Sequence, residues 1–160
     1  MRNKQIDGRI IGLLLVSFTA WTSLARETNL AFNCPVRVSV GKAAAADSVV
    51  DGNRGGGYWQ SSWNPPCWVE IDLGDIHEVR AIHVFTYYDD PRYYRYYLEV
   101  STDRRQWREV VNARENTTIS TSEGIKHVFD PVQARFVRLT VTFCSTRQSG
   151  HICEIEVYDR

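Results

Sequence analysis

The chain lacks an excess of charge of either sign, because its 160 residues include 19 Lys and Arg residues and 19 Asp and Glu residues. The broad basic footprint of a general nucleic-acid-binding protein is therefore missing, and no nucleic-acid partner is expected. Internal repeats and low-complexity segments are missing too, and helical periodicity extends nowhere over more than about two turns. With 43% hydrophobic and 12% aromatic residues, the composition is that of a folded domain with a core.

Sequence motifs of common catalytic and metal sites are also missing. There is no H-E-x-x-H and no G-x-S-x-G, and the four cysteines contain no C-x-x-C, so no zinc site is expected. The four histidines show no metal-ligand spacing. Surface carboxylates occur on every β-sandwich, so they do not by themselves indicate a glycosidase pair. The sequence therefore predicts that the protein is not an enzyme.

The first 25 residues have the pattern of a secretory signal peptide. A basic start with Arg2, Lys4 and Arg9 precedes an apolar stretch over 10–20 that is too short to span a bilayer comfortably. Small residues at 23 and 25 fit a cleavage site. The alternative is an uncleaved single-span anchor. We expect removal of 1–25, a secreted or periplasmic or extracellular location, and one domain over 26–160 with a net charge of −2.

The remainder of the chain is rich in period-two alternation between apolar and polar residues, which is typical of half-buried β-strands. Five segments show it or a β-branched run: 69–73, 79–85, 97–101, 136–143 and 153–157. Turn residues separate them, including Asp51-Gly52-Asn53 and Asp89-Asp90-Pro91. Several short strands with regular turn signals predict an all-β, antiparallel sandwich or barrel.

An ordered set of motifs carries a resemblance to a known family. The motifs are NLAFNCPV (29–36), VVDGN (49–53), WQSSW (59–63), WVEIDLG (68–74), YYLEVSTDRRQW (96–107), ARFVRLTVT (134–142) and EIEVYD (154–159). In this order and spacing they resemble the discoidin, or coagulation factor 5/8 C-type, domain family, and most closely its bacterial family 32 carbohydrate-binding modules. The resemblance implies an eight-stranded antiparallel jelly-roll sandwich of the galactose-binding-domain-like type.

The resemblance also implies ligand loops at one end of the sandwich. A sugar site needs an aromatic plate for the ring and polar groups for its hydroxyls. The matching loops offer both; their candidate ligand residues are Tyr87, Tyr88, Asp89, Arg92, Arg95, Arg147 and His151. We therefore expect a non-catalytic carbohydrate-binding module whose partner is a carbohydrate or glycoconjugate. The alternative is a protein- or cell-surface-adhesion discoidin domain with a protein partner.

Membrane lipid is not an expected partner. Family members that bind anionic membranes insert large apolar side chains from loop tips, and the first loop here (41–46) has only Gly, Lys and Ala. The net charge of −2 further weakens attraction to anionic lipid.

A structural calcium ion is expected from one turn and from the resemblance. Calcium prefers hard oxygen ligands from tight loops, and Asp51 and Asn53 offer such oxygens around Gly52. Ser61 or Ser62 could add another. The resemblance brings Glu154 beside this turn, which spacing alone does not. The alternative is that Asp51-Gly52 is a simple turn and Glu154 a solvated strand residue.

Four cysteines in an exported domain suggest two disulfides. Spacing allows three pairings and does not choose among them. In the fold that the resemblance implies, the first and last strands run side by side. With Asn29 assumed to lie near Tyr158, this arrangement implies Cys34–Cys153 and Cys67–Cys144. The main rival is Cys144–Cys153.

Overall fold

The protein forms an all-β sandwich in the computed structural model, which describes residues 27–40, 43–55, 57–61, 65–146 and 149–160. The elements are β1 (Val36–Val38), the 3-10 helix η1 (Ala43–Val49), β2 (Trp59–Gln60), β3 (Cys67–Thr86), β4 (Tyr94–Ser101), β5 (Arg108–Ala113), β6 (Ile125–Cys144) and β7 (His151–Tyr158). All strand pairs are antiparallel. The predicted fold class is confirmed, whereas the count of eight strands is wrong, since the described residues form seven.

Two long strands explain the lower count. β3 and β6 are each 20 residues long and pair with each other along most of their length, with register breaks after Asp72 and Val79 of β3. The first part of β3 also pairs with β1, and its last part pairs with β7. The second part of β6 pairs with β4, whose other edge pairs with β5. Each long strand therefore contributes to both layers of the sandwich. Because each continues without a break from one layer to the other, it counts as one strand and not as two.

The core lies between the two layers and is filled by alternate residues of the strands. Trp59, Tyr96, Leu139 and Ile155 are among its fully buried side chains. The alternation predicted for β4 is present, because every second residue from Tyr94 to Val100 is buried. β7 differs: all eight of its residues are buried, including two glutamates.

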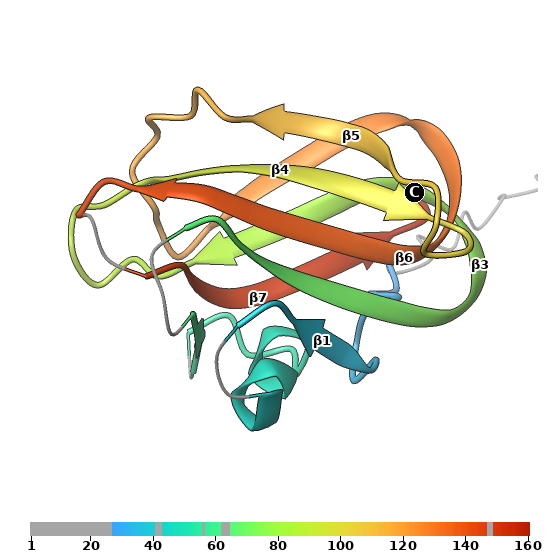
Figure 1. The fold of residues 1–160 in the computed structure, drawn as a ribbon, viewed down its shortest axis with the longest axis horizontal. Helices are drawn as coiled ribbons and strands as arrows, with labels where there is room; N and C mark the ends of the chain where they lie inside the picture. The colour runs from blue at the N-terminus through green and yellow to red at the C-terminus, as the bar shows by residue number, and fades with distance from the viewer. Residues whose placement is uncertain (1–26, 41–42, 56, 62–64, 147–148) are drawn as a thin grey trace, which may run out of the picture.

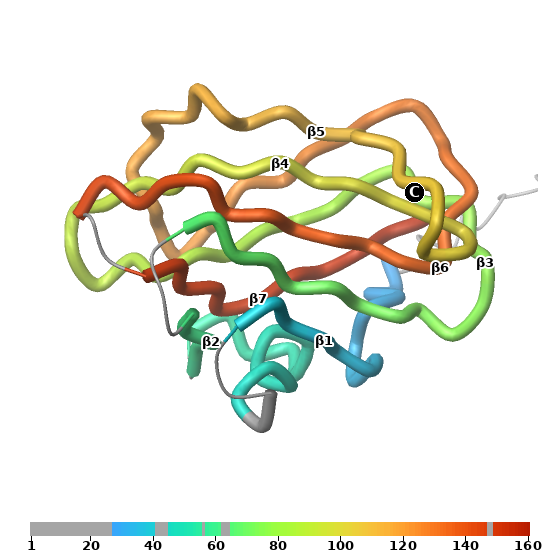
Figure 2. The backbone as a smooth tube through the Cα atoms, in the orientation of Figure 1, coloured from blue at the N-terminus to red at the C-terminus, as the bar shows by residue number. Residues whose placement is uncertain are grey.

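The connections that carry the candidate ligand residues lie at one end of the sandwich. In Figure 1 the β3–β4 connection lies at the left, beside the end of β6 and the start of β7, and the C-terminus lies at the right. The tube in Figure 2 shows β2 just beneath these connections. Backbone hydrogen bonds join the three segments, from Tyr87 N to His151 O (3.4 Å) and from Ser61 N to Gly150 O (3.0 Å).

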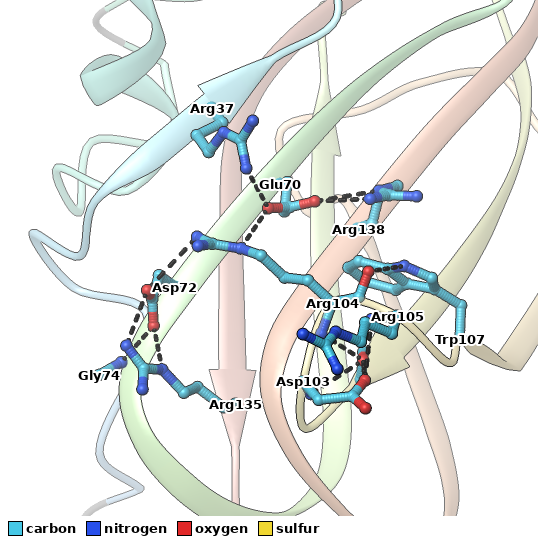
Figure 3. A network of polar contacts seen from close by, with 11 residues as sticks. Arg37, Glu70, Asp72, Gly74, Asp103, Arg104, Arg105, Trp107, Arg135 and Arg138 are labelled. Atoms are coloured by element: carbon cyan, nitrogen blue, oxygen red, sulfur yellow. Dashed lines mark hydrogen bonds and ion pairs between the residues drawn. The ribbon is translucent and has the colours of Figure 1, made fainter.

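Away from these connections, arginines surround two carboxylates of β3 (Figure 3). Glu70 is 2% exposed, and its carboxylate accepts hydrogen bonds from Arg104 Nε (2.9 Å) and Arg138 Nη2 (2.7 Å). Asp72 accepts two hydrogen bonds from Arg135, at 2.8 and 3.1 Å, which lower the pKa of its carboxyl. Because a buried carboxylate is costly without such partners, this network fixes how β3, β6 and the turn after β4 lie together.

Removal of the Glu70 carboxylate should therefore destabilise the fold. Breaking a buried ion pair costs about 3–5 kcal/mol, and we expect Glu70→Ala to lower the free energy of unfolding by about 3 kcal/mol, since its arginine partners stay partly hydrated. Arg37 is the control: its side chain is 62% exposed and lies 3.7 Å from Glu70, so Arg37→Ala should cost under about 1 kcal/mol. Urea denaturation measures both, and equal losses would contradict this role of Glu70.

Candidate functional site

A pocket of about 110 Å³ opens between the η1–β2 loop, the β3–β4 loop and the start of β7. Its lining residues, here called the tyrosine pocket, are Gly55, Gly57, Tyr58, Tyr87, Tyr88, Asp89 and Cys153. Tyr58 is 42% exposed and stands edge-on to Tyr87, with ring centroids 5.1 Å apart. The pocket thus has aromatic walls, an exposed ring at its rim and a carboxylate.

Glycine in the η1–β2 loop allows the pocket to form. A Cβ atom added to Gly55 would lie 2.5 Å from the hydroxyl oxygen of Tyr88. Such a distance is shorter than van der Waals contact allows, so a larger residue would displace Tyr88 or the loop. The close approach of backbone and ring brings Tyr58 and Tyr88 to the same pocket from segments 30 residues apart.

A buried polar cluster lies next to the pocket. Arg92 is 4% exposed and holds Asp90 through paired hydrogen bonds from Nε and Nη2. Its guanidinium lies 4.7 Å from the centroid of the Tyr87 ring. Nδ1 of His151 is 3.5 Å from Arg92 Nη1 and 3.2 Å from the hydroxyl of Tyr94. These contacts hold Tyr87 in place from behind, and this is the role that the structure gives Arg92 and His151.

The electrostatics of this cluster leave the pocket wall with one anionic group. Hydrogen bonds from Arg92 lower the pKa of Asp90. Burial and the nearby Arg92 charge lower the pKa of His151, so its imidazole is neutral at pH 7. Asp89 is exposed. Burial of the Tyr87 side chain, together with the charge of Asp89, raises the pKa of Tyr87. At pH 7 the Asp90 charge is therefore balanced by Arg92, while Asp89 gives the wall a negative charge.

The structure brings together most of the predicted ligand residues, though in different roles. Tyr87, Tyr88 and Asp89 line the pocket, and Arg92 and His151 lie behind it. Arg95 does not take part: its guanidinium lies 5.1 Å from the Phe143 ring, on the β4–β6 pair. Arg147 lies outside the described residues.

Sequence reasoning missed four contributors to the pocket: Gly55, Gly57, Tyr58 and Cys153. Alternating polarity placed Cys153 on a core-facing strand, and nothing in the chain near Tyr58 linked it to a loop 30 residues further on. The signal that could have found Tyr58 is the glycine run at 55–57 directly before it. Glycines permit close approach of backbone to another group, so an aromatic residue beside them is a candidate for a binding surface.

A second buried group, Glu154, lies on β7 below the same loop. The side chain is fully buried, and its Oε1 accepts a hydrogen bond from Gly52 N at 3.1 Å. Its Oε2 is buried and has no hydrogen-bond partner among the described residues. Burial, with the charges of Asp51 and Glu156, raises the pKa of Glu154 to about 7.

The residues predicted to bind calcium divide into two groups. Asp51 and Asn53 lie in the turn at Glu154, where Asp51 Oδ1 accepts from Asn53 N at 2.8 Å. Ser61 lies elsewhere, because its hydroxyl accepts a hydrogen bond from Gly150 N at 2.9 Å, so it does not belong to this set. Within the described residues there is no group of three or more His, Cys, Asp or Glu side chains placed to hold a metal ion. Glu154 Oε2, which has no hydrogen-bond partner among the described residues, lies beside the Asp51 turn. It nevertheless fits a cation whose coordination is completed by amide and main-chain oxygens.

The predicted disulfides, Cys34–Cys153 and Cys67–Cys144, are absent from the structure, in which all four cysteines are free. Leu30 N does bond to Val157 O (2.8 Å), close to the register that the prediction assumed. The chain then turns, with Asn33 at φ 57° and Cys34 N bonded to Ala31 O. This turn carries Cys34 away from β7 toward β1.

In the other predicted pair, Cys67 and Cys144, each thiol contacts a different neighbour. Cys67 Sγ lies against the backbone of Gly150, where an added Cβ would be 2.7 Å away. Cys144 Sγ lies 3.2 Å from the hydroxyl of Thr146. Each thiol is therefore packed against its own neighbour.

Residues 35–156 match the F5/8 type C domain family, which is more than half of the chain. The chain belongs to the F5/8 type C domain family. This confirms the resemblance seen in the sequence motifs. A comparison with curated proteins gave no match.

Solved structures with this F5/8 type C fold include several carbohydrate-binding modules. Chitosan-binding module 2 from a chitosanase/glucanase of Paenibacillus sp. IK-5, solved with chitotriose, has a TM-score of 0.69 and 26% identity over 81% of this chain and 99% of that chain. CBM32 of AlyQ, solved with 4,5-unsaturated mannuronic acid, has a TM-score of 0.68 and 19% identity over 81% of this chain and 98% of that chain, and shows the fold alone.

A family 89 glycoside hydrolase from Clostridium perfringens is also similar, with a TM-score of 0.71 and 29% identity. The structural match covers 81% of this chain but only 14% of that one, so this chain corresponds to a small part of the hydrolase. Within the described residues, no helix is both long and apolar enough to cross a membrane.

The buried His151 should make the stability of the domain sensitive to acid. Its pKa is lowered in the folded state, so the unfolded chain binds a proton more readily as the pH falls through about 6.5, and unfolding is favoured. We expect the free energy of unfolding to fall less between pH 7 and pH 5 in His151→Gln than in the wild type. Urea denaturation at the two pH values measures this, and parallel losses would contradict it.

Proposed function

We propose that this domain is a carbohydrate-binding module and that the tyrosine pocket holds the saccharide. The observation that carries the proposal is the pocket itself: tyrosine rings enclose a space of about 110 Å³ beside the Asp89 carboxylate. Sugar rings present apolar C–H faces that pack on aromatic rings, and hydroxyls that bond to carboxylate and phenol oxygens. The carbohydrate complexes of the structural neighbours agree with this use of the fold.

The concave shape favours a sugar over the alternative of a protein partner. Protein interfaces are broad and of the order of 800 Å² on each side, whereas small ligands are enclosed in clefts. Here the aromatic groups converge on one pocket, with Tyr58 at its rim and Tyr87 held from behind by Arg92.

We also propose that the domain binds without cleaving. Hydrolysis of a glycosidic bond ordinarily uses two carboxyl groups that flank it. Of the two acids in the β3–β4 loop, Asp90 is engaged by Arg92, which leaves Asp89 at the pocket.

We also propose that residues 1–25 direct export of the protein and that residues 26–160 are the binding domain. The leader lies outside the described residues.

Tyr58→Ala tests the pocket directly. Loss of an exposed aromatic platform should weaken binding of a saccharide about tenfold or more, which corresponds to about 1.4 kcal/mol, with little change in stability because Tyr58 is 42% exposed. A glycan array followed by calorimetry on the best ligand measures the loss. Tyr97→Ala is the control, since this half-buried tyrosine of β4 packs under Arg114 (3.9 Å) and does not line the pocket. Equal affinities of the wild type and Tyr58→Ala for that ligand would contradict the proposal.

We further propose that calcium binds at Glu154, Asp51 and Asn53. Bound calcium would supply a fixed positive charge for the buried Glu154 carboxylate, whose Oε2 otherwise has no partner among the described residues. The ion would thereby hold the turn at Asp51 and Asn53 against β7.

Calcium should therefore raise the melting temperature. Free calcium at 100 times its dissociation constant would add about 2.7 kcal/mol to the free energy of unfolding. This corresponds to a rise of several degrees in the melting temperature. Glu154→Gln should abolish the difference between melts in calcium and in chelator, whereas Asp130→Asn, at an exposed position of β6, should keep it. A calcium shift that survives in Glu154→Gln would place the ion elsewhere.

A further inference from the structure

The two neighbouring acids of the β3–β4 loop differ in their surroundings. Asp90 is bound by the Nε and Nη2 groups of Arg92, and its pKa is lowered by them. Asp89 lines the tyrosine pocket, and no ion pair joins it to a basic side chain within the part of the chain that the structure describes. One acid is therefore held by an arginine, whereas the other hydrogen-bonds the phenol of Tyr87 in the pocket wall and has no basic partner among the described residues.

The described wall of the pocket carries no positive charge to balance Asp89. Its lining consists of glycines, tyrosines, Asp89 and Cys153. Arg54, the basic residue beside Gly55, is directed to β7, where its Nε and Nη2 each lie 2.9 Å from a carboxylate oxygen of Glu156.

The effect of this charge is seen at a neighbouring group of the wall. Burial, the charge of Asp89 and a hydrogen bond to the Asp89 side chain together raise the pKa of Tyr87. The carboxylate of Asp89 is therefore the one charged group in the described lining of the pocket.

The aromatic walls suit a positive charge as well. The face of a tyrosine ring attracts a cation within about 6 Å of its centroid. Tyr87 already holds one cation in this way, since the Arg92 guanidinium lies 4.7 Å from its centroid. Tyr58 is the more exposed ring and offers a similar surface at the rim.

We propose that the tyrosine pocket selects saccharides that carry a protonated amine, of the glucosamine type, over N-acetylated and acidic ones. The ammonium group would donate hydrogen bonds to the Asp89 carboxylate while tyrosine faces surround it. An N-acetyl group has no charge to offer Asp89, and a uronic acid would be repelled by it. This specificity rests on the proposed function, because it concerns the ligand of the same pocket.

Calorimetry with three trisaccharide probes tests the specificity: chitotriose, its fully N-acetylated form and a mannuronate trimer. At pH 6, where the sugar amine is protonated, chitotriose should bind about tenfold more tightly than either of the others, a difference of about 1.4 kcal/mol. The preference should weaken as salt is added, since it depends on charge.

Asp89→Asn is the decisive variant. It keeps the size of the side chain and removes the charge, so chitotriose should lose about tenfold in affinity while the N-acetylated trimer is unaffected. Asp130→Asn, which removes an exposed carboxylate of β6, should leave the affinities of all three probes unchanged. Folding of each variant is checked by its melting curve.

The possible failures are distinguishable. If the N-acetylated or acidic trimer binds as tightly as chitotriose, or Asp89→Asn keeps full affinity for chitotriose, the amine specificity is wrong; a loss of that same binding in Tyr58→Ala would still leave the pocket as a sugar site. If no saccharide on a glycan array binds, the proposed function fails and the specificity fails with it.

Discussion

Two glutamates buried on the last strand determine how the loop before β2 lies. Glu154 and Glu156 are 0% and 5% exposed, and carboxylates at such positions are costly unless hydrogen-bonded. The loop supplies the partners, through Gly52 N to Glu154 and the Arg54 guanidinium to both oxygens of Glu156. Because these contacts fix residues 52–54, they also fix Gly55 and Tyr58, which form one wall of the tyrosine pocket.

The opposite wall is fixed by a second charged group. Arg92 is buried between Asp90, Tyr87 and His151, and ties the β3–β4 loop to the start of β7. The pocket thus lies between two loops, each anchored by hydrogen bonds to side chains of β7. Rigid placement of aromatic side chains lowers the entropy lost when a ligand is bound, which benefits a shallow site with few contacts.

Alternation of polar and apolar residues predicted the class of fold well, since period two follows from the geometry of a strand. It predicted less well which polar residues are buried. Glu154 and Glu156 alternate with apolar residues as a solvated face would, yet both are buried, because a loop about 100 residues earlier in the chain covers them. The strand count failed for a related reason: β3 and β6 continue from one layer to the other.

The candidate site was predictable where its residues are adjacent in sequence. Tyr87, Tyr88 and Asp89 lie in one loop of aromatic and charged residues, and all three line the pocket. Tyr58 was missed because its contact with Tyr87 depends on how two distant loops pack. The pairing of Cys34 with Cys153 was wrong because a turn after Leu30, rather than a continuous strand, leads to Cys34.

Use of the tyrosine pocket as the saccharide site can be mapped residue by residue. Titration of the isotopically labelled protein with chitotriose, followed by backbone amide NMR, reports which residues sense the ligand. The expected chemical shift changes are confined to Tyr58, Tyr87 to Asp89 and His151 to Cys153. Changes gathered instead around the open groove lined by Phe32, Arg54 and Tyr158, with none at the pocket, would contradict it.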